Sequence, residues 1–322
     1  MSGIAGSMLL LMGVGGLLAW RGWINEPVRD FMADLVTKVA LPAIIISNLN
    51  EYFTRDDLWL SLSNIYIPCV ALAAGMGLSW ICSALFRIQK NRRGVFAAIC
   101  AYPNSVFLGL PICIATFGQA AAPIALYYYL GATVMFWTIG LWGMARDGRT
   151  ASAESKTENK TSILNTITRH LKLLFSPAII TVLAVCLQIS LGIKLPDVIL
   201  RPAGYLASLC VPLALLFIGA TLFSAFKAGV RWYKGMAWML FARAVVSPAL
   251  CFCAVALFNA PPLIAQVFVL QSAMPAMSQT PMVARSCGAD DAFAAAGTAL
   301  STIACMVCLP LVRVVQTVVY GS

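Results

Sequence analysis

The sequence contains very few charged residues. Only 11% of its 322 residues are Asp, Glu, Lys or Arg, whereas 61% are hydrophobic. A soluble domain of this length carries about a quarter charged residues. The scarcity of charge therefore excludes a water-soluble globular protein and indicates a polytopic membrane protein, with the lipid bilayer as its surroundings.

Histidine is almost missing as well. The single histidine, His170, falls in a polar segment, and all eleven cysteines fall in or at the ends of apolar stretches. Thiols in such stretches behave as small hydrophobic side chains. One histidine with no neighbouring acid or thiolate cluster disfavours an enzyme, and we expect no cofactor and no metal site.

Carboxylates are missing from the middle of the apolar stretches. The twelve Asp and Glu residues lie in loops or at the ends of these stretches. A proton or sodium antiporter built on crossed helices needs a carboxylate at the crossing. Cation exchange is therefore disfavoured and an anionic or neutral organic substrate is favoured, while coupling to H⁺ or Na⁺ stays open.

Ten apolar stretches are present, and each exceeds the roughly 17 residues that cross a bilayer. They lie at about 3–20, 31–48, 59–86, 94–117, 122–144, 173–193, 200–225, 235–258, 262–287 and 292–320. A polar segment at 145–172 separates the first five from the last five. The sequence thus predicts two five-helix repeats, at 1–144 and 173–322, joined by a linker.

The basic residues predict how the chain is oriented. With the N-terminus outside, the inner loops contain 16 Lys and Arg residues and the outer loops contain 3. Basic loops face the cytoplasm, so we expect both termini outside and the linker 145–172 in the cytoplasm. This distribution also explains the net charge of +10, and no nucleic-acid partner is expected.

Two prolines occupy corresponding places in the two halves. Pro103 and Pro275 lie 172 positions apart, inside the fourth and ninth stretches, and a shift of 172 also superimposes the first five stretches on the last five. Proline interrupts a helix, and paired interruptions mark the midplane site of secondary transporters. Five is an odd number, so the second repeat must be inverted. The expected fold is an all-α membrane protein in which broken helices 4 and 9 cross.

Polar side chains follow both breaks. Asn104 and Ser105 come after the first proline, and Ser278 and Gln279 come after the second. Free N–H groups at the start of a half-helix attract anions, and these side chains add hydrogen bonds that would orient a carboxylate. We therefore expect all four residues to contact the substrate.

Two further polar residues in the second half are candidates. Gln271 lies one turn before Pro275, where its amide would face a cavity. Arg243 lies within the eighth stretch, and an arginine inside a membrane helix is a candidate functional residue. It would either balance the charge of the substrate or hold backbone carbonyls between helices.

Four segments resemble the auxin efflux carrier family, whose bacterial members are described as malate or malonate permeases. They are YPNSVFLGLP (102–111), VALPAIII (39–46), VPLALLFIGATL (211–222) and MPAMSQTPMVARSCGADDAFAAAGTALST (274–302). The family's crossover residues correspond to Pro103, Asn104 and Pro275. This chain departs from the family where Asn often follows the second proline, because it has Gln279 there, with Ser278 before it.

The resemblance implies a fold shared with bile-acid sodium symporters and similar to that of sodium–proton antiporters. It also implies a homodimer and an elevator mechanism. Stretches one, two, six and seven would form the scaffold, and stretches three to five and eight to ten would form the moving part.

The function expected from these observations is secondary transport of a small organic anion across a bacterial inner membrane. A mono- or dicarboxylate such as malate or malonate is the expected substrate. The alternative is a sodium-coupled organic-anion symporter of the bile-acid type, whose cation site would consist of carbonyls and amides.

Overall fold

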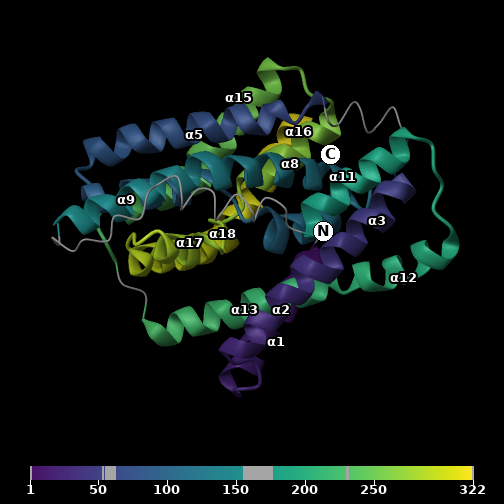
Figure 1. Cartoon of the computed structure of the whole chain (residues 1–322), viewed down its shortest axis with the longest axis horizontal. Coiled ribbons are helices and arrows are strands. Elements are labelled where there is room, and N and C mark those ends of the chain that lie inside the picture. Colours follow the sequence, from purple (N-terminus) through teal and green to yellow (C-terminus); the bar gives the residue numbers. More distant parts are fainter. Residues whose placement is uncertain (1, 53, 55–62, 155–176, 230–231, 321–322) are drawn as a thin grey trace. The chain divides into compact units, whose positions relative to one another are not determined.

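The computed structural model describes residues 2–52, 54, 63–154, 177–229 and 232–320 (Figure 1). Within these ranges every regular element is a helix, and the only β-type pairing is an isolated bridge between Pro103 and Ala276. Most of the predicted linker 145–172 lies outside the described residues. Its first residues continue a helix that ends at Glu154.

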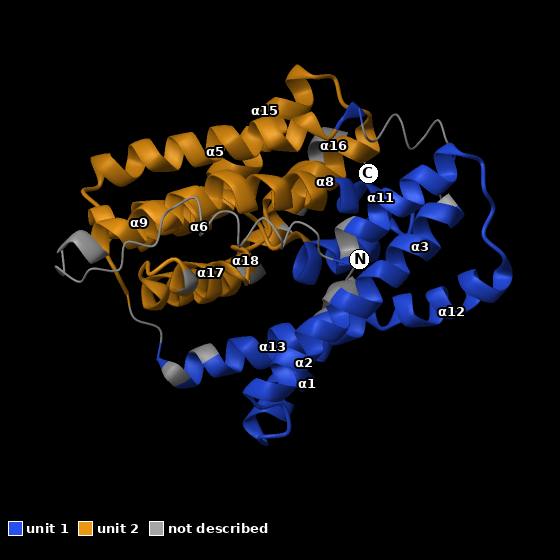
Figure 2. Cartoon of the chain, in the orientation of Figure 1, with its two compact units in different colours: residues 1–64, 106–127, 175–229 blue, residues 65–105, 128–174, 230–322 orange. Residues whose placement is uncertain are grey.

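The chain divides into two compact units (Figure 2). Unit 1 contains residues 1–64, 106–127 and 175–229, and unit 2 contains residues 65–105, 128–174 and 230–322. Each unit therefore draws on both halves of the sequence. This grouping resembles the division into scaffold and moving part that the family resemblance implies, except that the second half of stretch four and the first residues of stretches three and five belong to unit 1.

Unit 1 consists of helices from three separate parts of the chain. They are α1 (Ser2–Trp20), α2 (Glu26–Leu35), α3 (Leu41–Tyr52), α7 (Leu110–Phe117), the first residues of α8 (Ala121–Met135), α11 (Pro177–Ser190), α12 (Asp197–Ser208) and α13 (Cys210–Ala228). Helix α1 packs along α13, and α3 packs against α11 and α12.

Glycines allow α1 and α13 to approach closely. A Cβ atom on Gly15 would lie 2.1 Å from the carbonyl oxygen of Leu216, and one on Gly219 would lie 1.8 Å from that of Met12. Small residues at such contacts let helix backbones meet, which is the usual way in which membrane helices associate. These two glycines therefore fix the contact on which unit 1 is built.

Unit 2 contains the remaining helices. They are α5 (Tyr66–Leu85), α6 (Arg93–Ala101), the rest of α8, α9 (Leu141–Glu154), α14 (Met236–Phe241), α15 (Ser247–Leu257), α16 (Pro262–Ser272), α17 (Thr280–Ser286) and α18 (Asp291–Tyr320). A 3₁₀ turn, η2 (Lys90–Arg92), precedes α6.

Aromatic contacts show that α5 runs antiparallel to the segment formed by α14 and α15. The ring of Phe86, just after α5, lies 5.3 Å from that of Trp238 at the start of this segment. At the opposite end of α5, the ring of Tyr66 lies 4.9 Å from that of Phe258, which follows α15. The two segments therefore lie side by side along the whole length of α5 and run in opposite directions.

In the part of the chain that the structure describes, four wide π-helical turns interrupt the helices: η1 (Val36–Ala40), η3 (Ser105–Gly109), η4 (Phe136–Gly140) and η6 (Ala242–Val246). In three of them a proline follows the turn by two residues, namely Pro42, Pro111 and Pro248. A proline cannot donate to the preceding turn, and its ring clashes with that turn. The wider turn makes room for the ring, so these helices continue past their prolines.

Five helical segments among the described residues are long and apolar enough to cross a membrane. They are Glu26–Glu51, Tyr66–Leu85, Ala121–Ala151, Asp197–Ser224 and Met236–Leu257. The fourth and ninth stretches yield only shorter apolar helices, Ser105–Phe117 and Pro262–Ser272, because each is interrupted. Large apolar side chains such as Leu187 and Val198 are more than half exposed, as expected of surfaces that face lipid.

Candidate functional site at the helix crossing

The breaks in the two interrupted stretches lie side by side in unit 2. Helix α6 ends at Ala101, and Tyr102 continues in an extended conformation. The backbone N–H of Asn104 donates to the carbonyl of Pro275 at 2.7 Å, and that of Met277 donates to the carbonyl of Tyr102 at 3.0 Å. These two bonds pair the breaks antiparallel and satisfy backbone groups that proline leaves without helical partners.

The polar side chains predicted from the first break have different roles in the structure. Nδ2 of Asn104 donates to Oγ of Ser278 at 2.6 Å, so a side chain from each break meets at the crossing. Asn104 is buried and Ser278 is half-buried. Ser105 is also buried, and its hydroxyl donates to the carbonyl of Pro103 at 3.4 Å, within its own turn.

A serine that the sequence analysis did not identify completes the second break. The hydroxyl oxygen of Ser301, on α18, accepts a hydrogen bond from the backbone N–H of Ala276 at 3.0 Å. Thr280 closes the following turn, because its hydroxyl donates to the carbonyl of Met277 at 2.7 Å. In the sequence, Ser301 stands out only as a polar residue in an apolar stretch.

Gln279 and Gln271 lie in contrasting environments. Gln279 is half-buried and directly precedes α17, but its side chain does not cap that helix. Gln271 is fully buried in the last turn of α16, and neither atom of its amide has a hydrogen-bond partner among the described residues. A buried polar group without a partner costs about 1–3 kcal/mol, so the Gln271 amide is available to a bound molecule or water.

Arg243 is the central cation of the crossing. It is buried, and its Nη1 donates to the carbonyls of Cys100 and Ala101 at 3.0 and 3.1 Å, in the last turn of α6. Its Nη2 donates to the carbonyl of Ser272 at 3.0 Å, and Nε donates to that of Met274 at 3.1 Å. Nη2 also donates to the Met274 carbonyl. One side chain therefore binds the carbonyl ends of both broken stretches.

Buried ionisable side chains lie at both ends of α6. At its first turn the carboxylate of Asp147 accepts a hydrogen bond from the N–H of Val95 at 2.8 Å. At its last turn the Arg243 guanidinium binds the carbonyls. A negative group at the N-terminus and a positive group at the C-terminus both stabilise a helix through its dipole. This arrangement holds the short helix α6 in place beside the crossing.

Asp147 corrects one expectation of the sequence analysis. Asp147 was expected in the polar segment after stretch five, but helix α9 continues through it, and its side chain is only 1% exposed. The reason is tertiary. The first N–H groups of α6 require an acceptor, and the Asp147 carboxylate supplies one inside unit 2. It therefore lies at the end of α6 opposite to the crossing.

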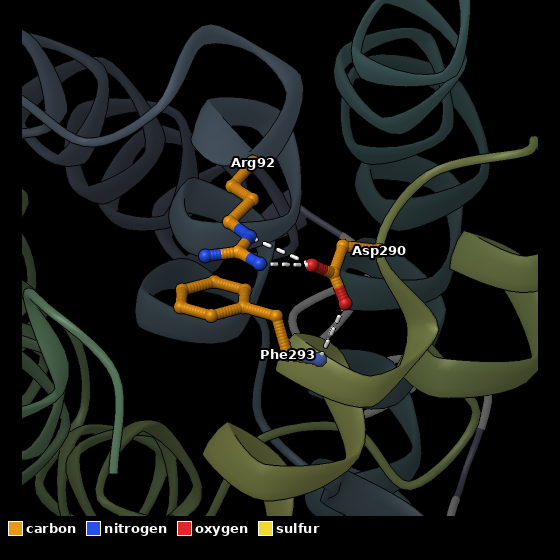
Figure 3. A network of polar contacts seen from close by, with 3 residues as sticks. All are labelled: Arg92, Asp290 and Phe293. Atoms are coloured by element: carbon orange, nitrogen blue, oxygen red, sulfur yellow. Dashed lines mark hydrogen bonds and ion pairs between the residues drawn. The ribbon is translucent and has the colours of Figure 1, made fainter. Parts of the chain in front are cut away.

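A second polar cluster joins loops at the same end of unit 2 as Asp147 (Figure 3). Nε and Nη2 of Arg92 bind Oδ2 of Asp290 at 2.7 and 2.6 Å, and Oδ1 of Asp290 accepts from the N–H of Phe293 at 2.8 Å. The Arg92 guanidinium also lies over the rings of Phe293 and Tyr233. The cluster connects the turns that precede α6, α14 and α18, all of which were predicted to face the cytoplasm.

Comparison with known proteins bears on what this arrangement does. The family described as "Membrane transport protein" matches residues 7–313. An uncharacterized transporter of Methanocaldococcus jannaschii is 27% identical over 279 residues, which cover 85% of each chain. An uncharacterized transporter of Methanothermobacter thermautotrophicus is 28% identical over 142 residues, or 42% of this chain and 44% of that protein. Because the family match covers nearly the whole chain, this protein belongs to the membrane transport protein family, the auxin efflux carrier family that its crossing motifs resemble.

Proposed function

We propose that the protein is a secondary active transporter that moves a small organic anion, such as malate, malonate or another mono- or dicarboxylate. The observation that carries this proposal is the crossing itself. There, a buried guanidinium is fixed beside a pair of polar side chains, Asn104 and Ser278. Arg243 offsets the partial negative charge of the two carbonyl ends that it binds, so the crossing carries no net negative charge that would repel an anion.

Hydrogen-bonding groups near the crossing suit a carboxylate. Asn104 and Ser278 already share one hydrogen bond, so rotation of either side chain would redirect a donor to a ligand. Gln271, with a free amide in the last turn of α16, provides another N–H donor in the same unit. Ser105 and Gln279 follow the same breaks and belong to the proposed site as flanking residues.

The proposal includes the organisation expected from the sequence. The chain would cross the bacterial inner membrane ten times, as inverted five-helix repeats at 1–144 and 173–322, with both termini outside and the linker 145–172 in the cytoplasm. The pairing of breaks 172 residues apart supports this arrangement. The charge distribution of the loops supports the orientation.

An elevator mechanism with a homodimeric scaffold follows from the family. Unit 2 contains Asn104, Ser278, Gln271 and Arg243, and so it would carry the substrate. Unit 1 would form the scaffold. The grouping of helices into these two units supports the proposal, because the substrate-contacting residues belong to a single compact body.

The function is tested with purified protein in liposomes. Uptake of labelled malate and malonate is measured against unlabelled competitors, including acetate, citrate and an uncharged amide of malonate. Saturable uptake that carboxylates inhibit and the amide does not inhibit is expected. Uptake of the uncharged amide at the rate of malonate would contradict an anion site.

Ligand binding is measured separately by thermal stability in detergent. A true substrate raises the melting midpoint in proportion to the logarithm of its concentration above Kd. The stabilising carboxylate should be the one that competes best in uptake. Chloride at equal ionic strength controls for salt effects.

A further inference from the structure

The carbonyl oxygens around Arg243 form a set that a metal cation would bind if the side chain were absent. The set consists of four backbone carbonyls, those of Cys100, Ala101, Ser272 and Met274. Backbone carbonyls are the ligands that K⁺ filters use, and unwound carbonyls and half-helix C-terminal ends coordinate Na⁺ in transporters. These oxygens surround one planar guanidinium group, because each of them accepts from one of its three nitrogens.

A fifth oxygen belongs to this set. The hydroxyl of Ser247, one helical turn after Arg243, lies 3.4 Å from Nη1 and itself donates to the carbonyl of Ser272 at 2.9 Å. Ser247 therefore connects the arginine's own helix to the end of α16. Hydroxyl and carbonyl oxygens together are a donor set for hard cations.

The charges at this point cancel with Arg243 in place. The C-terminal end of a helix carries roughly half a negative charge, so the ends of α6 and α16 amount to about one negative charge. The guanidinium supplies one positive charge, because arginine remains protonated in proteins. No additional cation is needed to neutralise the two carbonyl ends.

We propose that Arg243 is a built-in cation that takes the place of a co-transported Na⁺ at the crossing, so that anion transport by this protein does not depend on Na⁺. This inference rests on the proposed function, since it specifies how the anion transporter is coupled. It separates this chain from the alternative of a sodium-coupled symporter. An arginine with a purely structural role would hold the carbonyls just as well. In that case, however, the carbonyl oxygens left after its removal would not form a site for Na⁺.

The local geometry explains why an arginine fulfils this role. Arg243 lies in the π-helical turn Ala242–Val246, which precedes Pro248. Its planar fork presents N–H donors in several directions at once, and a lysine ammonium does not match this pattern. A fixed guanidinium moves with unit 2 and needs no ion gradient to bind.

The test uses cation-dependent melting of three purified proteins in detergent: wild type, Arg243→Ala and Arg243→Lys. Each is titrated with NaCl, choline chloride and millimolar guanidinium chloride at constant ionic strength. We expect wild type and Arg243→Lys to respond equally to NaCl and choline chloride. In Arg243→Ala, guanidinium or Na⁺ should bind the carbonyl oxygens that no longer have the arginine as a partner. Either cation should raise the melting midpoint by about 5 °C at saturation, whereas choline should not.

Arg285→Ala is the matched control, because Arg285 belongs to the same unit and its side chain is 83% exposed. This variant should show no saturable response to guanidinium. If Arg243→Ala folds and Na⁺ stabilises it no more than choline does, the inference is overturned, even where guanidinium restores stability. If Arg243→Ala cannot be purified, the comparison of wild type with Arg243→Lys decides, because a Na⁺-specific stabilisation of either would overturn it.

Uptake into liposomes completes the test. Wild-type uptake of labelled malate should be equal with Na⁺ and with choline outside. A several-fold stimulation by Na⁺ would overturn the inference while leaving anion transport intact. Conversely, a failure of all carboxylate uptake would reject the proposed function, whereas the melting experiment needs no substrate and would still report on the cation site.

Discussion

Asn104 and Ser278 share a hydrogen bond of 2.6 Å although 174 residues separate them in the sequence. Each follows a proline that ends a helix, and the backbone bond from Asn104 to Pro275 holds the two segments in register. The contact therefore depends on two local chain breaks and on one long-range pairing. It is the most direct link between the sequence motifs and the proposed substrate site.

Loss of either partner of this pair should reduce transport. We expect Asn104→Ala and Ser278→Ala each to lower malate uptake about tenfold, which corresponds to roughly one lost hydrogen bond. Because the residues form one unit, the double variant should be little worse than the worse single variant. Asn50→Ala is the control, since the side chain of Asn50 donates to the carbonyl of Ile46 in its own helix. If the Asn104→Ala protein takes up malate at the wild-type rate, the crossing is not part of the substrate site.

Gln271 should affect stability and transport in opposite directions. Replacing its unpaired amide with a similar apolar side chain in Gln271→Met removes a desolvation cost, so the melting midpoint should rise. Uptake should fall, because the ligand loses a donor. Gln316→Met is the contrasting variant, since Nε2 of Gln316 donates to the Gln266 carbonyl at 2.8 Å, and its loss should lower the midpoint. A fully active Gln271→Met protein would contradict the proposed role.

Two glycines of α1 should respond differently to the same change. Gly15→Ala places a methyl group 2.1 Å from the carbonyl of Leu216, whereas Gly13→Ala meets nothing within 4 Å. The first should destabilise unit 1 by about 1–3 kcal/mol through overpacking. The second should be neutral or slightly stabilising, because alanine favours a helix more than glycine does. Melting midpoints in detergent measure both, and equal effects would contradict the close packing of α1 on α13.

Asp290 has two functions that substitutions can separate. Asp290→Asn keeps an acceptor for the N–H of Phe293 but loses the charge that pairs with Arg92, whereas Asp290→Ala loses both. Loss of a helix cap costs about 1 kcal/mol, and a partly exposed ion pair contributes less. The alanine variant should therefore melt at the lower temperature. High salt should reduce the difference between wild type and Asp290→Asn.

The exposed pair of Arg201 and Asp197 provides the reference for this comparison. Both side chains are about three-quarters exposed, and the pair lies on one turn of α12. Asp197→Asn should leave the melting midpoint nearly unchanged, because solvent screens such pairs. A larger loss there than for Asp290→Asn would show that exposure does not govern these contacts.

Much of the helical framework was predictable because its signals are local. Apolar stretches long enough to cross a bilayer, and prolines that remove backbone donors, act on the chain where they stand. All ten predicted stretches contain helices in the described residues. The π-helical turns before Pro42, Pro111 and Pro248 were not predicted, because a proline in an apolar stretch does not by itself tell whether the helix stops or widens for one turn.

The site was predictable only in part. The sequence singles out Asn104 and Ser278, because Asn104 directly follows Pro103 and Ser278 lies three residues after Pro275 in an apolar stretch. The sequence left Arg243 between two roles, and the structure gives it backbone carbonyls as partners. Ser301 and Asp147 were not identified as partners of the broken segments, since their binding partners are distant in sequence.

By itself, the sequence determined that the chain is a membrane protein with two interrupted helices, because hydrophobicity and the missing proline N–H are properties of single segments. Only the tertiary structure decided which groups satisfy the interrupted ends. The carbonyls of α6 and α16 meet the guanidinium of a third segment, and the N–H groups of α6 meet a carboxylate of a fourth. In an apolar interior, each backbone N–H or C=O group without a hydrogen-bond partner is costly, so the packed structure must supply one. These partners lie far away in the sequence, and no local sequence pattern predicts them.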